Sequence, residues 1–211
     1  MERTKYRLTI IRPQMISMLF MIINITYYFS LVKTGDVKDS DFMIRSGALY
    51  VSGIVENREY YRFLISTIMH FSLFHLVVNM ISLYCVGNYV ESHLGHGKFL
   101  VLYLCTSIGS SIFSFFDIYA DGEKIIVAGA SGAIYGIVGA LIWIVLCHRG
   151  HFESISITEL IGLTAIVFWY GYVSGGVNSA IHISGLVIGF LIAILIYRRD
   201  RDYDVREWLE S

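Results

Sequence analysis

Apolar residues gather in six long stretches of this 211-residue chain, and polar residues separate the stretches. An α-helix needs about 20 consecutive, mostly apolar residues to cross the hydrocarbon core of a bilayer. The stretches have about this length, so they predict an all-α membrane protein with six transmembrane helices. Their approximate bounds are Gln14–Val32, Ile68–Val90, Phe99–Phe116, Ala130–Cys147, Thr158–Val173 and Ser179–Tyr197.

Composition agrees with a membrane protein and narrows the function classes. The chain is 55% hydrophobic and 16% charged, with a mean hydropathy of +0.62, whereas a soluble domain carries about 25% charged residues. A net charge of −1 offers no basic surface, so we expect no nucleic-acid partner. We expect one domain over residues 1–211. Cys85, Cys105 and Cys147 lie in or beside apolar runs, and we expect them to be buried free thiols.

Lysine and arginine predict the orientation, because they are concentrated on the cytoplasmic side of membrane proteins. The tails at about 1–13 and 198–211 each carry four of these residues. Six spans place both tails on one side, so both termini are expected in the cytoplasm. The longest connection, Lys33–Tyr61, then faces outside. It contains aromatic and apolar residues, so we expect an ordered element lying at the membrane surface.

This topology brings the unusual polar residues of three spans to a similar depth. Ser131 lies at the outer end of the fourth span, and His182 at the outer end of the sixth. His75 and Asn79 lie in the outer half of the second span and are four residues apart, so they share one helix face. Polar and ionisable groups inside a membrane are costly and usually functional. The sequence therefore predicts one polar cluster near the outer face.

Small residues near the serine and the histidine also have a purely structural interpretation. Gly132, Gly136 and Ala140 recur every four residues on the fourth span, and Gly185 and Gly189 follow His182 on the sixth. Such stripes let helices approach backbone to backbone in a membrane. Close packing of the two stripes would also place the serine beside the histidine, so the structural interpretation supports a functional one.

A serine–histidine pair favours acyl-transfer chemistry. A serine hydroxyl is a weak nucleophile until a base takes its proton, and His182 is the candidate base. The negative charge that develops in the transition state needs preorganised donors. The backbone N–H of Ser131 lies at a helix start, where such groups are unpaired. The side chains of Asn79 and His75 are the other candidate donors.

The ordered set of motifs resembles the rhomboid family of intramembrane serine proteases, in its minimal six-span bacterial-type form. The matching segments are HFSLFHLVVN at 70–79, Tyr61-Arg62, ESHLGHGKF at 91–99, GASG at 129–132, Tyr135 and HISGLVIG at 182–189. The resemblance implies a Ser131 nucleophile, a His182 base and an oxyanion hole formed by His75, Asn79 and the Ser131 amide. Supporting roles are implied for Tyr135, which would hold the His182 ring, and for Gly129, Gly132, Gly185 and Gly189. Structural roles are implied for Arg62 in the first loop and Glu91 at the inner end of the second span.

The resemblance further implies cleavage of transmembrane proteins near the outer face of a bacterial cytoplasmic membrane. The expected substrates have helix-weakening residues near that face, membrane lipid surrounds the protein, and no cofactor or metal is expected. Two alternatives remain at this stage. A non-catalytic rhomboid-like protein would bind membrane clients and typically lacks the serine or the histidine, although both are present here. A small six-span transporter would be indicated by inverted repeats or interrupted helices, and the only proline is Pro13.

Overall fold

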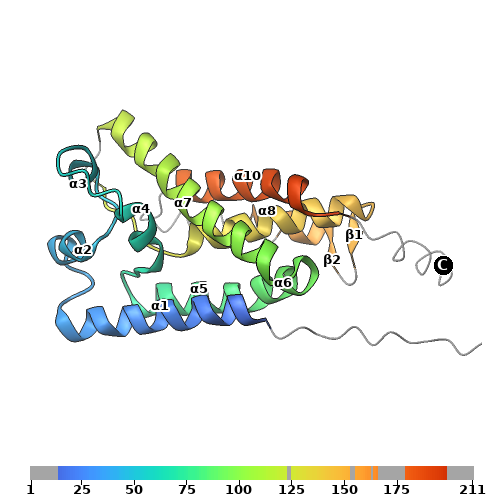
Figure 1. Ribbon diagram of the computed structural model, residues 1–211, viewed down its shortest axis with the longest axis horizontal. Helices are drawn as coiled ribbons and strands as arrows, with labels where there is room; N and C mark the ends of the chain where they lie inside the picture. Colours follow the sequence, from blue (N-terminus) through green and yellow to red (C-terminus); the bar gives the residue numbers. More distant parts are fainter. Residues whose placement is uncertain (1–13, 123–124, 153–154, 163, 166–178, 199–211) are drawn as a thin grey trace, which may run out of the picture.

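The computed structural model describes residues 14–122, 125–152, 155–162, 164–165 and 179–198, and these are mostly helical (Figure 1). Four of its helical stretches are long and apolar enough to cross a membrane: Met15–Thr34, Leu73–Leu94, His96–Asp121 and Ser179–Ile196. A fifth apolar helix, Ser131–Cys147, has 17 residues. The chain is therefore an all-α bundle of membrane-spanning character.

The helices coincide with five of the six predicted spans. They are α1 (Met15–Thr34), the joined segment α5 (Leu73–Ser82), η2 (Leu83–Gly87) and α6 (Asn88–Leu94), then α7 (His96–Asp121), α8 (Ser131–Cys147) and α10 (Ser179–Ile196). Most of the span predicted at 158–173 lies outside the described residues, although 157–162 and 164–165 are helical. The count of six spans therefore stays a prediction.

The second membrane helix begins five residues later than the hydropathy pattern predicts. Residues 69–72 are not helical, and α5 begins at Leu73, where the Ser72 side chain accepts a hydrogen bond from the His75 backbone N–H at 3.1 Å. A serine in this position satisfies one of the donors left unpaired at a helix start. Hydropathy alone missed this boundary because the residues before Ser72 are themselves largely apolar.

The long first connection is structured, as its apolar content predicts. It contains α2 (Ser40–Ser46), α3 (Val51–Val55), α4 (Arg62–Ile65) and the short 3-10 turn η1 (Ser66–Ile68). Arg62 is buried and donates to the carbonyl oxygens of Ile44 and Ala48, each at 2.7 Å, and its Nε donates to Glu59 at 2.7 Å. A buried guanidinium with these partners ties α4 to the end of α2 and to the turn after it. We call this end of the bundle, which carries α2 and α3, the loop end.

At the opposite end, two-residue strands β1 (His151–Phe152) and β2 (Ile155–Ser156) pair antiparallel. The sequence pattern did not predict this small hairpin, and we call this end the hairpin end. Figure 1 shows α5, α8 and α10 starting toward the loop end and running to the hairpin end, while α1 and α7 run the other way. The first residues of α5, α8 and α10 therefore lie toward the same end of the bundle.

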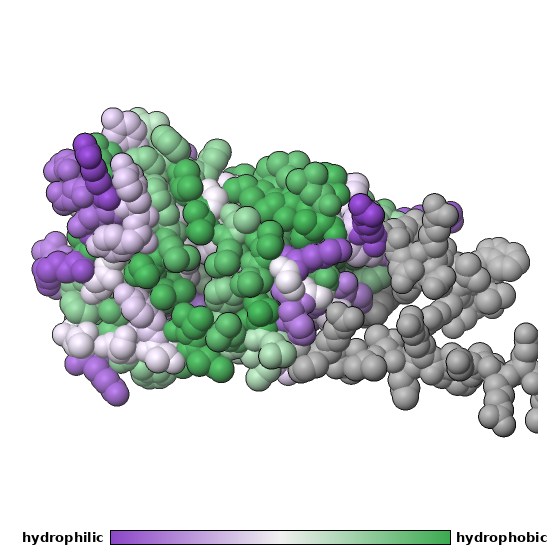
Figure 2. All heavy atoms as spheres, viewed as in Figure 1, coloured by the Kyte–Doolittle hydropathy of each residue, from purple (hydrophilic) through white to green (hydrophobic). Residues whose placement is uncertain are grey.

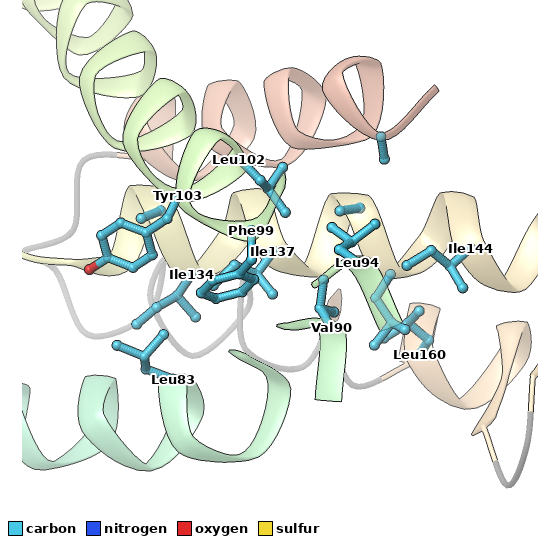
Figure 3. Close-up of a cluster of buried hydrophobic side chains, with 14 of the residues drawn as sticks. Leu83, Val90, Leu94, Phe99, Leu102, Tyr103, Ile134, Ile137, Ile144 and Leu160 are labelled. Carbon is cyan, nitrogen blue, oxygen red and sulfur yellow. The ribbon is translucent and has the colours of Figure 1, made fainter. Parts of the chain in front are cut away.

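Helix α8 forms the centre of the bundle and is the most enclosed of the long helices. Its buried residues lie on all sides, as expected for a helix surrounded by other helices. Ile134 and Ile137 of α8 pack with Leu83 of η2 and with Phe99 and Tyr103 of α7 in one apolar cluster (Figure 3). This cluster holds α8 against the two preceding helices and leaves its other side for α10.

The outer surface of the helices is apolar. Figure 2 shows hydrophobic residues across the middle of the visible face and hydrophilic ones at its two ends. Phe74 of α5 and Leu195 of α10, for example, are 66% and 80% exposed. The prediction of buried thiols is wrong for Cys85 and Cys105, which are exposed, and Cys147 is intermediate. The apolar runs that contain these cysteines have one face toward the membrane, which the linear pattern does not distinguish from the core.

Candidate active site

Ser131 and His182 form a hydrogen-bonded pair at the N-terminal ends of α8 and α10. Ser131 is the first residue of α8, and its Oγ lies 2.9 Å from Nε2 of His182. His182 is 8% exposed, and Ser131 is intermediate in burial. A neutral imidazole whose Nε2 accepts this hydrogen bond has the geometry of a general base beside a nucleophile.

Glycine residues make this pairing possible by bringing α8 and α10 into backbone contact. A Cβ added to Gly185 would overlap the carbonyl oxygen of Gly132, and one added to Gly189 would overlap that of Gly136. A Cβ on Gly139 would overlap the carbonyl oxygen of Leu186 in the same way. The predicted stripes therefore do face each other, and only glycine fits at these contacts.

Two of the predicted α8 glycines also pack against a second helix, α7. Side chains added at Gly132 and Gly136 would collide with Ser110 and Thr106 of α7, respectively. The carbonyl oxygens of these two glycines therefore contact α10, and the positions that a side chain would take contact α7. One stripe thus packs against two helices. The sequence pattern missed Gly139, because it does not follow the four-residue repeat that starts at Gly132.

Tyr135 lies one helical turn after Ser131 and stacks on His182. The ring centroids are 4.3 Å apart, and the ring planes differ by 22°. A stacked aromatic neighbour restricts the rotation of the imidazole. The His182 ring that meets Ser131 is therefore packed on one face by Tyr135.

His75 reaches the same place from α5. Gly129, two residues before Ser131, has φ +141°, and a Cβ built there would lie 2.9 Å from Cε1 and 3.0 Å from Nε2 of His75. The same Cβ would lie 3.7 Å from Oγ of Ser131. The His75 ring therefore packs on Gly129 beside the serine, and both its φ angle and this contact require glycine at that position.

The segment before the serine is held by the first connection. The Gly129 N–H donates to the Ser66 carbonyl at 2.9 Å, and Val127 and Leu49 exchange backbone hydrogen bonds of 2.9 and 3.1 Å. These bonds attach the lead-in of α8 to η1 and to the turn after α2. The loop end thus fixes the position from which Ser131 projects.

Asn79 follows His75 by one turn on α5 and is 6% exposed. Within the described part of the chain, its Nδ2 has no hydrogen-bond partner. A buried amide donor without a partner is uncommon in proteins. The first turn of α8 likewise has no side-chain cap, since Ala130 precedes it. Both features leave N–H donors unpaired, one on the helix face that carries His75 and the others in the first turn of α8.

Arg62 and Glu91 lie outside this cluster. Arg62 bonds to the turn after α2, as described above. Glu91 of α6 is buried at the hairpin end, where its two oxygens accept from the backbone N–H groups of Ile16 and Ser17 at 2.9 and 2.8 Å. Ser17 Oγ adds a bond of 2.7 Å, and His96 Nδ1 lies 2.7 Å from the same carboxylate. Glu91 therefore caps the start of α1 from another helix.

Comparison with known proteins gives a consistent assignment. The family model described as "Rhomboid domain" matches residues 57–199. The chain is 34% identical over 176 residues to rhomboid protease GluP of Bacillus subtilis. The aligned region covers 83% of this chain and 33% of GluP. It is 27% identical over 206 residues to rhomboid protease AarA of Providencia stuartii, covering 85% of this chain and 71% of AarA. It is also 27% identical over 189 residues to rhomboid protease GlpG of Photorhabdus laumondii, with 85% of this chain and 60% of GlpG covered.

The chain thus spans only a third of GluP but most of AarA. The matched region includes every polar residue of the cluster around Ser131. The extent of the family match and the helical architecture lead to one conclusion. This chain belongs to the rhomboid family.

Proposed function

We propose that this protein is an intramembrane serine endopeptidase that uses Ser131 and His182 as a catalytic dyad. The observation that carries the proposal is the 2.9 Å contact between Oγ of Ser131 and Nε2 of His182, in a bundle of membrane-spanning character. The relatives named rhomboid proteases support the same reaction class. The client-binding and transporter alternatives give no reason for this contact.

The proposed reaction proceeds through an acyl-enzyme. His182 Nε2 takes the proton from Ser131 as Oγ attacks the carbonyl carbon of the scissile peptide bond. The tetrahedral intermediate then collapses, the C–N bond breaks, and His182 returns the proton to the leaving amine. Water enters, gives a proton to His182, and hydrolyses the ester to release the acid and restore the serine.

The oxyanion of each tetrahedral intermediate requires donors close to Ser131. We assign this role to the Ser131 backbone N–H, the His75 ring and the Nδ2 group of Asn79. Asn79 Nδ2 has no partner among the described residues and the His75 ring packs on Gly129, and both observations support the assignment. Donors that are already oriented stabilise the transition state without reorganisation.

The position of the site in the bundle supports a proposal for the substrate class. The polar cluster lies toward the loop end, which we assign to the outer side of a bacterial cytoplasmic membrane with both termini in the cytoplasm. A helical substrate must unwind before its peptide bonds become accessible, because helical carbonyls and N–H groups are already paired. We therefore propose transmembrane protein substrates with helix-weakening residues near their outer ends.

Cleavage of a model transmembrane substrate in proteoliposomes tests the proposal. The substrate carries glycine and other helix-weakening residues near one end of its apolar segment. We expect wild-type protein to cleave it, and Ser131→Ala and His182→Ala each to reduce kcat by at least about 10³-fold, as for a nucleophile or base. The matched control is Ser184→Ala, because Ser184 is a buried α10 serine that donates to the Ala180 carbonyl of its own helix. Equal cleavage by wild type and Ser131→Ala would contradict the dyad.

A further inference from the structure

His70 is fully buried between η1 and α5, and the dyad and oxyanion hole proposed above do not use it. Its side chain is 0% exposed. Within the described part of the protein, neither ring nitrogen makes a hydrogen bond of good geometry, and the backbone acceptor near the ring is that of Ile68. Leaving a buried polar group unpaired destabilises the folded protein. An apolar ring of the same size would fill this space without that cost, so the nitrogens need an explanation.

The same protein satisfies a comparable histidine elsewhere. His148, at the hairpin end, is 2% exposed, and its Nδ1 lies 2.9 Å from the Ile144 carbonyl oxygen. It also packs against Phe152, with ring centroids 4.3 Å apart. Full burial therefore does not by itself prevent a histidine of this chain from forming a hydrogen bond to the backbone. The lack of a well-formed hydrogen bond at His70 needs a local explanation.

The contact that distinguishes His70 is with His75. Their ring centroids are 4.9 Å apart, and the planes are inclined by 68°. The His75 ring also lies against Gly129, beside Ser131. His75 thus contacts both His70 and the backbone that leads to the serine.

We propose that His70 is a positioning residue that holds the His75 ring in the orientation that donates toward the oxyanion. The two rings meet edge to face, and the edge of an imidazole carries polar atoms that a phenyl ring lacks. This inference rests on the proposed function, in which His75 is an oxyanion donor.

The test separates a polar role of His70 from a packing role. His70→Phe keeps the ring and removes both nitrogens, whereas His70→Gln keeps a polar group. For His70→Phe we expect an unfolding midpoint equal to or above that of wild type. We also expect kcat on the model substrate to fall on the order of tenfold with KM unchanged, less than the roughly 10²–10³-fold cost of deleting an oxyanion donor. His70→Gln should recover part of kcat.

His148→Phe is the matched control, since it makes the same change at a buried histidine far from Ser131. It should lower the unfolding midpoint and leave kcat per folded molecule unchanged. Wild-type kcat in His70→Phe would overturn the inference, as would a loss of kcat that merely follows a loss of folded protein.

A double-mutant cycle with His75→Ala tests whether His70 acts through His75. If it does, adding His70→Phe to His75→Ala causes no further loss of kcat, because the two effects are not additive. Full additivity would overturn the inference while leaving the dyad intact. Failure of the proposed function itself looks different, since Ser131→Ala would then cleave as well as wild type.

Discussion

At the hairpin end of the bundle, the buried Glu91 carboxylate receives hydrogen bonds from Ile16, Ser17 and His96. At the loop end, the buried polar groups are organised differently. Ser131 and His182 bond to each other, and the Asn79 amide nitrogen has no partner among the described residues. Both regions bury polar groups inside an apolar bundle. Both oxygens of the Glu91 carboxylate accept hydrogen bonds, whereas the Asn79 amide donates none to the described residues.

The difference indicates how to separate structural from chemical polarity in a membrane protein. A group whose bonds are all made inside the protein, such as Glu91, stabilises the fold, and changing it should affect folding. An unpaired donor on the helix face that carries His75, such as that of Asn79, is available to a reacting group, and changing it should affect rate. Three substitutions test this distinction, in order of their expected effect on the rate of cleavage.

Asn79→Ala should have the largest effect on rate of the three and little effect on stability. Losing one oxyanion donor costs roughly 10²–10³-fold in kcat, while no internal hydrogen bond of the Nδ2 group is lost. Substrate cleavage in proteoliposomes and the midpoint of unfolding in detergent measure the two quantities. Asn88→Ala, at a buried asparagine of α6, is the control and should leave kcat unchanged. A large loss of stability in Asn79→Ala would instead indicate that Asn79, like Glu91, has a structural role.

Gly189→Ala should reduce both rate and stability. The added methyl group overlaps the Gly136 carbonyl oxygen, so α10 must move away from α8 and carry His182 with it. Overpacking of this kind typically costs about 1–3 kcal/mol, and we expect kcat to fall on the order of tenfold through misplacement of the base. Gly97→Ala in α7 is the matched control, because nothing lies within 4 Å of its added Cβ. Wild-type behaviour of Gly189→Ala would contradict the backbone contact.

Glu91→Gln should have the smallest effect on rate and a clear effect on stability. It replaces one acceptor oxygen with an NH2 group that faces the donors at the start of α1. We expect a loss of about 1.5–3 kcal/mol, the range for hydrogen bonds to a charged group, with kcat per folded molecule unchanged. Circular dichroism during denaturation measures the first quantity, and Glu56→Gln at an exposed glutamate is the control. A fall in kcat without a fall in stability would contradict the structural role of Glu91.

Much of the architecture could be predicted from the sequence, because a bilayer requires long apolar helices. Polar residues within these helices are costly to bury, so the few that occur stand out in the sequence. The small-residue stripes predicted that α8 and α10 pack closely, and Ser131 and His182 do lie together. The roles of these residues remain proposals.

Other features depend on three-dimensional surroundings that the linear pattern does not contain. Gly139 contacts the backbone at Leu186 only because the two helices cross there. The start of α5 depends on the Ser72 cap, and the exposure of Cys85 depends on which helix face meets lipid. The His70–His75 contact likewise arises where a non-helical turn folds back on α5.

The measurement that tests the central claim most directly is labelling of the detergent-solubilised protein with a fluorophosphonate probe, which reacts with an activated serine. Wild type, Ser131→Ala and His182→Ala are compared at equal amounts of folded protein. We predict that wild type is labelled and that both variants lose the label, because Ser131 is the nucleophile and His182 activates it. Labelling that persists in Ser131→Ala would contradict the account, since another serine would then be the reactive one.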